Sequence, residues 1–164
     1  MASKEKKGSG KAAAAETGSV TRQQLIDGLN EDLAREYQAI IAYVVYSQSI
    51  KGAQYMNIAD ELEKHAGEEL SHAITIASQI DYLGGDITAV PKPVKTSDDP
   101  KAMLRFDLDN ESDTIRNYRV RLKQCEALGE FAISEHIRRI LQQEQEHLTD
   151  LADALGIDPP NLSN

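Results

Sequence analysis

Four long apolar stripes, each interrupted near its middle by acidic or imidazole side chains, constrain this chain more than any other feature. Apolar residues recur there at steps of three or four, the period of one face of an α-helix. The stripes cover four segments: residues 21–50, 54–83, 100–128 and 130–155. A glycine follows each segment within a few residues, as is usual after a helix: Gly52, Gly84, Gly129 and Gly156. Helices of nearly thirty residues are much longer than average, so we predict a long helical bundle.

The connections between these segments predict the topology. The breaks after residues 50 and 128 are very short, which favours two antiparallel hairpins. Residues 84–99 form a longer connection with two prolines. Sixteen extended residues reach about 50 Å, and a thirty-residue helix is about 45 Å long. We therefore predict an all-α, four-helix bundle over residues 20–158 with one long crossover between helices two and three, although a connection of this length can also bulge outward.

The residues that interrupt the stripes are the candidate functional residues. They are four glutamates and two histidines: Glu36, Glu69, His72, Glu111, Glu144 and His147. An ionised carboxylate in an apolar interior costs several kcal/mol unless it is paired or binds a metal. Four such groups also repel one another, and the stripes contain no lysine or arginine. The pattern therefore requires a positive counterpart from outside the chain.

The six residues also repeat at a fixed spacing. Glu36, Glu69 and His72 each recur 75 residues later, and so does Tyr43, as Tyr118. Glu69 and His72 share one helix face, as do Glu144 and His147. All six lie at similar heights relative to the turns. We therefore expect a duplicated hairpin whose six side chains meet at the middle of the bundle.

Four carboxylates and two imidazoles with twofold symmetry form a ligand set for two metal ions. Two divalent ions would carry four positive charges and neutralise the four glutamates. Oxygen-rich ligands with one imidazole per metal suit iron or manganese, with zinc as a further occupant. Tyr43 is a candidate second-shell residue that hydrogen-bonds a ligating carboxylate or passes an electron to oxygen. A packed core tyrosine is an equally good interpretation.

Four segments carry a resemblance to a known family. LNEDLAREYQAIIAY, EELSHA, MLRFDLDNES and QQEQEHL resemble the ligand-bearing segments of the bacterioferritin branch of the ferritin-like superfamily, in order and separation. The similarity covers about residues 20–155. It implies that Glu36 and Glu111 are terminal ligands, that Glu69 and Glu144 bridge two iron ions, and that His72 and His147 each hold one ion.

The resemblance also implies a function. The family oxidises Fe(II) with oxygen or hydrogen peroxide and stores the ferric product as mineral inside a hollow shell. We therefore expect a di-iron ferroxidase that acts in iron storage or detoxification. Two alternatives remain, a Dps-like particle that protects DNA and a rubrerythrin-like peroxidase. Thr114 stands where the third helix of the latter usually carries an extra glutamate, which weakens that alternative.

Two departures from the family pattern concern haem and assembly. Haem-bearing bacterioferritins have a methionine directly after the bridging glutamate of helix two, where this chain has Leu70. This argues against haem ligation. Only nine residues follow Leu155, too few for the family's fifth helix. A shell of 24 subunits, a Dps-like shell of 12 and a bare dimer all stay open.

Other residues predict packing and subunit contacts. The first helix is apolar nearly all round at Ile40, Ile41, Val44 and Val45, so we expect one side to face a twofold-related copy of the chain. Three further residues are interpreted mainly as structural core residues: His65, Tyr118 and Cys125. For His65, one turn before Glu69 on the same stripe, the alternative is a place on a path for iron.

Composition excludes several other classes of protein. A single cysteine rules out a disulfide framework and a rubredoxin-like four-cysteine centre. A net charge of −9 and 5% aromatic residues disfavour nucleic-acid-binding modules. The chain has no membrane-spanning run and no secretory signal, so we expect a cytoplasmic protein. For residues 1–19 we predict a disordered lysine-containing tail, with a DNA-binding arm as the alternative. For residues 159–164 we predict a short C-terminal tail.

Overall fold

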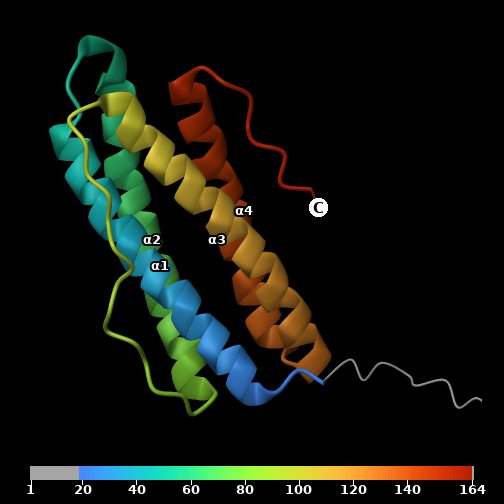
Figure 1. The fold of residues 1–164 in the computed structure, drawn as a ribbon. Coiled ribbons are helices and arrows are strands. Elements are labelled where there is room, and N and C mark those ends of the chain that lie inside the picture. The colour runs from blue at the N-terminus through green and yellow to red at the C-terminus, as the bar shows by residue number, and fades with distance from the viewer. Residues whose placement is uncertain (1–18, 164) are drawn as a thin grey trace, which may run out of the picture.

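The computed structural model describes residues 19–163 and contains four long α-helices (Figure 1). Their bounds are α1 Arg22–Ser49, α2 Met56–Tyr82, α3 Pro100–Leu128 and α4 Phe131–Leu155. This confirms the predicted all-α, four-helix fold. Within this part of the chain, none of the helices is long and apolar enough to cross a membrane. The tail predicted for residues 1–19 falls almost wholly outside the described residues.

Local signals set the helix ends. Thr21 and Gln24 form a reciprocal capping box at the start of α1, in which each side chain accepts a hydrogen bond from the backbone N–H of the other residue. Pro100 occupies the first turn of α3, and Gly129 ends it with a φ of 75°. The sequence placed the start of the second helix at residue 54. Instead, a 3₁₀ turn, η1 (Ala53–Tyr55), precedes α2.

The connection between α2 and α3 runs along α1. Near the start of α1, Asn30 hydrogen-bonds the carbonyl of Asp86 (2.9 Å) and the amide of Thr88 (2.8 Å). Near the end of α1, the Tyr46 hydroxyl donates to the carbonyl of Lys95. The connection therefore spans most of the length of α1, as Figure 1 shows, and α2 and α3 are parallel. This confirms the long crossover.

Two apolar clusters fill the two ends of the bundle. One is built around Leu25, Leu29 and Ile80, and the other around Leu62 and Leu104. Cys125 is fully buried in the first cluster, which confirms its expected place in the core. The candidate metal-binding residues lie in the layer between the two clusters.

The C-terminal segment folds back onto the bundle (Figure 1). Leu162 is buried against the apolar cluster that contains Leu104, and Arg119 of α3 donates to the Leu162 carbonyl. The described part of the predicted C-terminal tail, residues 159–163, is therefore anchored to the bundle through Leu162.

Candidate metal centre

The six predicted ligands lie together in the middle of the bundle. Each residue is at most 3% exposed. They form two groups of four whose ligand atoms lie within 4.8 Å of one another. The first group is Glu36, Glu69, His72 and Glu144, and the second is Glu69, Glu111, Glu144 and His147. Because Glu69 and Glu144 belong to both groups, the two groups are adjacent and have two carboxylates in common.

Both imidazole rings turn the same nitrogen toward the shared carboxylates. The Nδ1 atom of His72 lies 3.1 Å from Glu69 Oε2 and 3.2 Å from Glu144 Oε1. The Nδ1 atom of His147 lies 2.9 Å from Glu69 Oε1 and 3.3 Å from Glu144 Oε2. Each shared carboxylate therefore directs one oxygen to each histidine, which is the arrangement of a bridging ligand.

Several buried oxygens of the centre accept no hydrogen bond from the described residues. These atoms are Glu36 Oε2, Glu69 Oε1, Glu111 Oε2, Glu144 Oε1 and Glu144 Oε2. His147 Nδ1 also has no partner with hydrogen-bond geometry. Buried polar atoms are rarely left unpaired, and here they converge on common points. The donor set therefore fits two divalent cations, and its oxygen-rich character suits iron, manganese or zinc.

Two tyrosines hold the two carboxylates that are not shared. The Tyr43 hydroxyl donates to Glu111 Oε1, and the Tyr118 hydroxyl donates to Glu36 Oε1. Tyr118, which the sequence indicated as a structural core residue, is fully buried and also hydrogen-bonds Glu36, one of the predicted ligands. Each tyrosine fixes a carboxylate contributed by the other hairpin, because Tyr43 and Glu36 lie on α1 whereas Tyr118 and Glu111 lie on α3.

The outer nitrogens of the two histidines have different partners. His72 Nε2 lies 2.9 Å from Gln143 Oε1, and His147 Nε2 lies 2.9 Å from Glu68 Oε2. Such acceptors fix the tautomer of a metal-binding imidazole with Nδ1 toward the metal. Sequence reasoning missed both residues, although each one directly precedes a predicted ligand glutamate.

Burial and mutual repulsion govern the pKa values of the centre. Burial, followed by the charges of Glu69 and Glu144, raises the pKa of Glu36 well above its usual range. The pKa of Glu111 is raised for the same reasons. Burial alone would lower the pKa of His147, but hydrogen bonds to Glu144 and Glu69 outweigh it and raise that pKa to about 12. Without metal, protons therefore replace the missing positive charge.

His65 lies next to the centre on α2. Its ring stacks on His147 with 4.0 Å between ring centroids, and its Nε2 lies 3.2 Å from Asp150 Oδ2. It is 1% exposed, as expected of a core histidine, but its ring contacts the polar side chains of His147 and Asp150.

Comparison with known proteins extends the similarity to most of the chain. Residues 26–158 match the ferritin-like domain. A bacterioferritin from Desulfovibrio desulfuricans is 31% identical over 129 residues, which cover 78% of this chain and 72% of that protein.

Solved structures agree with this match. A ferritin-like diiron-carboxylate protein from Bacillus anthracis has a TM-score of 0.79 at 32% identity, with 82% of this chain and 96% of that chain covered. The bacterioferritin-related protein from Bacteroides fragilis, described as a dodecameric thioferritin, has a TM-score of 0.77 at 28% identity, with 84% of this chain and 88% of that chain covered.

Proposed function

We propose that this chain, which belongs to the bacterioferritin branch of the ferritin-like family, oxidises Fe(II) at its buried carboxylate centre for iron storage or detoxification. The observation that carries the proposal is the sharing of Glu69 and Glu144 between two adjacent groups of buried ligands. A single metal would not need two such groups, and a purely structural polar cluster would pair its oxygens with hydrogen-bond donors.

In this proposal the six residues bind a pair of Fe(II) ions as substrate. Glu36 and His72 hold one ion, Glu111 and His147 hold the other, and both ions share the remaining two glutamates. Tyr43 and Tyr118 keep the terminal carboxylates in place through the hydrogen bonds described above. The proposal includes no haem, because Leu70, at the position of the haem-ligating methionine, has no sulfur atom to offer.

The oxidation balances over the iron pair. Each Fe(II) loses one electron, so the pair reduces one dioxygen to hydrogen peroxide with uptake of two protons. With hydrogen peroxide as oxidant, the same two electrons and two protons give two water molecules. The four carboxylates favour the higher charge of Fe(III), because hard oxygen ligands stabilise a hard cation. The bundle supplies fixed geometry and a dry interior.

Storage of the ferric product requires an assembly with an interior. The relative from Bacteroides fragilis is described as dodecameric, and we propose that this chain also forms a closed homo-oligomer.

Aerobic oxidation of Fe(II), followed by the absorbance of the ferric product, tests the proposed reaction. Glu69→Gln and Glu144→Gln each remove one shared carboxylate while keeping its volume, and we expect either substitution to reduce the initial rate by about a hundredfold, in line with the loss of a group that acts at the reacting centre. Glu146→Gln is the matched control, because Glu146 is an exposed glutamate on the same helix. Rates in both shared-ligand variants equal to that of the control would refute the assignment.

A further inference from the structure

The two halves of the duplicated bundle differ on one side of the metal centre. The 75-residue repeat that relates the ligands also relates Glu68 to Gln143 and His65 to Ile140. Beyond His72, the second half therefore supplies a neutral amide and an apolar side chain. Beyond His147, the first half supplies a carboxylate and an imidazole. Among the described residues, potential metal ligands therefore extend outward from His147 but not from His72.

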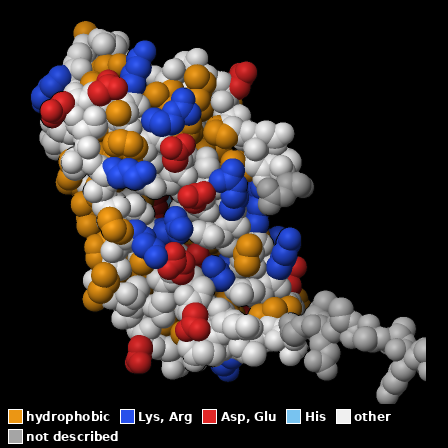
Figure 2. Space-filling view, in the orientation of Figure 1, with side chains coloured by type: hydrophobic (Ala, Val, Ile, Leu, Met, Phe, Trp, Pro, Cys, Tyr) orange, Lys and Arg blue, Asp and Glu red, His pale blue; other side chains and the backbone are white. Residues whose placement is uncertain are grey.

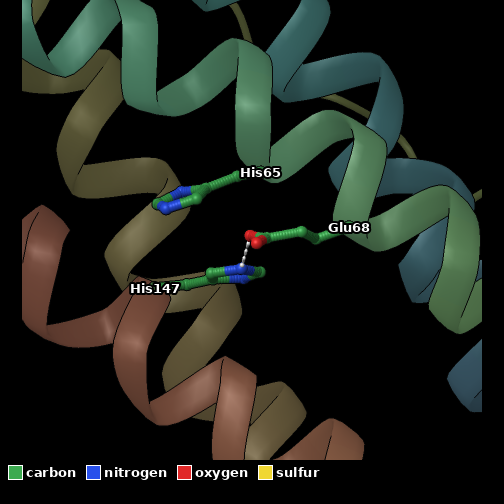
Figure 3. Close-up of side chains that lie close together, drawn as sticks. All are labelled: His65, Glu68 and His147. Atoms are coloured by element: carbon green, nitrogen blue, oxygen red, sulfur yellow. Dashed lines mark hydrogen bonds and ion pairs between the residues drawn. The ribbon is translucent and has the colours of Figure 1, made fainter.

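These outward groups lie in direct contact with the centre. Figure 3 shows the Glu68 carboxylate, from α2, reaching toward the His65 and His147 rings, with its hydrogen bond to His147. Single ligand atoms of His65, Glu68 and His147 lie within 4.8 Å of one another. The Nδ1 atom of His65 is buried and has no hydrogen-bond partner among the described residues.

His65 belongs to a second group that reaches the surface. Ligand atoms of Glu61, His65 and Asp150 also lie within 4.8 Å of one another. Glu61 stands one helical turn before His65 on α2, and Asp150 comes from α4. The Asp150 side chain is 44% exposed. Glu61 and Asp150 both line a surface cavity of about 220 Å³, together with Asp153. The two groups together therefore form a continuous series of potential metal ligands from this cavity, through His65, to His147.

We propose that Glu61, His65 and Asp150 form a third divalent-cation site, through which Fe(II) reaches the paired centre from the His147 side. One imidazole and two carboxylates form a ligand set that suits a divalent transition metal. Because His65 is common to both groups of ligands, a cation can pass inward by exchanging one set of partners for the next. This inference rests on the proposed function for its substrate, Fe(II), but the cation site itself does not require the oxidation.

Zinc binding tests the site without any oxidation. Zn(II) per chain is measured by equilibrium dialysis of the full-length assembly, and Co(II) positions are located by anomalous scattering in crystals. We expect Asp150→Asn and His65→Gln each to lose one Zn(II) per chain relative to the wild type, with affinity at that site weakened by at least the roughly tenfold that loss of an outer-shell partner costs. Asp153→Asn is the matched control, because Asp153 lines the same cavity but lies outside the ligand group.

A variant with both Glu69→Gln and Glu144→Gln separates this inference from the proposed function. If the third site exists, this double variant keeps one Zn(II) and one Co(II) peak between His65 and Asp150. Unchanged Zn(II) binding in Asp150→Asn, together with no Co(II) peak beside His65, would overturn the third site and leave the paired centre intact. Asp150 lies at the surface, so its substitution is informative even if His65→Gln fails to fold. Loss of one Zn(II) in Asp150→Asn with none lost in the double variant would support the third site and refute the paired one.

Discussion

At the scale of residues, protonation of single side chains sets the net charge of the buried centre when no metal is bound. His72 and His147 have raised pKa values and balance two carboxylates as imidazolium ions. Glu36 and Glu111 have pKa values raised by burial and by their charged neighbours, so these carboxyl groups keep their protons. Four protons thus give a neutral centre, and two divalent cations give the same net charge once those protons leave.

This exchange predicts opposite pH dependences for the metal-free and metal-loaded protein. Histidine titrates near pH 6.5 when unfolded, whereas His147 titrates at about 12 in the fold. Above about pH 6.5 the folded state therefore binds more protons than the unfolded state. For each such extra proton, the free energy of unfolding falls by about 1.4 kcal/mol for every unit by which the pH rises. The raised pKa values of Glu36 and Glu111 also lower the free energy of unfolding as the pH rises above about 4.3, the usual pKa of glutamate. We expect the metal-free protein to melt at a lower temperature at about pH 8.5 than at about pH 6.5.

Zn(II) should reverse this trend, because metal binding releases the protons. The increase in melting temperature on addition of Zn(II) should be larger at the higher pH. A pH electrode in weakly buffered solution should record the release of about four protons per chain when two Zn(II) ions bind. A metal-free protein whose melting temperature rises between these pH values, or zinc binding without proton release, would contradict this description of the centre.

At the scale of elements, a buried ion pair joins α1 to α3. Arg121 Nε lies 2.6 Å from Asp32 Oδ2, and both side chains are buried. The Arg121 guanidinium passes directly over Gly28 of α1. A Cβ atom on Gly28 would lie 1.9 Å from Arg121 Nη1. The absence of a side chain at Gly28 is therefore what allows Arg121 to reach Asp32.

The effect of Gly28→Ala should consequently depend on Arg121. In the wild type, alanine displaces the guanidinium and leaves Asp32 without its partner, so we expect a loss of about 1–3 kcal/mol of stability despite the better helix propensity of alanine. In an Arg121→Met background there is no guanidinium to displace, and the same substitution should be neutral or stabilise by up to about 1 kcal/mol. Thermal melting of the four proteins in this double-mutant cycle measures the coupling. Equal effects of Gly28→Ala in both backgrounds would show that the contact between Gly28 and the Arg121 guanidinium does not contribute to stability.

The elements also show what the sequence can and cannot predict. The helices, the crossover and the set of mid-bundle acids could be predicted because each depends on periodicity, chain length or the 75-residue spacing. The contacts of Tyr118 with Glu36 and of Glu68 with His147 could not, because they join different helices and depend on how those helices are rotated about their axes. The start of α2 was also missed. Gly52, with a φ of 125°, turns the chain there, and a 3₁₀ turn comes before the α-helix.

At the scale of the whole molecule, one flank of the bundle is apolar and open to solvent. Ile41, Val44 and Val45 of α1 are 41%, 51% and 37% exposed, and Leu70 and Ile74 of α2 are also exposed. Figure 2 shows apolar side chains along the edge of the molecule that corresponds to the α1 side of Figure 1, whereas the face toward the viewer mixes acidic and basic groups. Apolar patches of this kind are rare on monomeric proteins and mark contact surfaces. They fit the twofold partner expected from the sequence.

Val44→Glu tests whether this flank joins copies of the chain. A charge at the centre of an apolar contact is left without a partner when the contact forms, which costs several kcal/mol per interface. Because the contact would recur throughout any shell built from twofold dimers, one substitution should shift the mass in solution to smaller species, whatever the full number of subunits. Val120→Glu is the matched control, because Val120 is 50% exposed and lies on a different helix, α3. Native mass spectrometry of the two variants measures the difference. An assembly of wild-type mass in Val44→Glu would place the contact elsewhere, and an equal loss of mass in both variants would show that added charge alone disrupts the assembly.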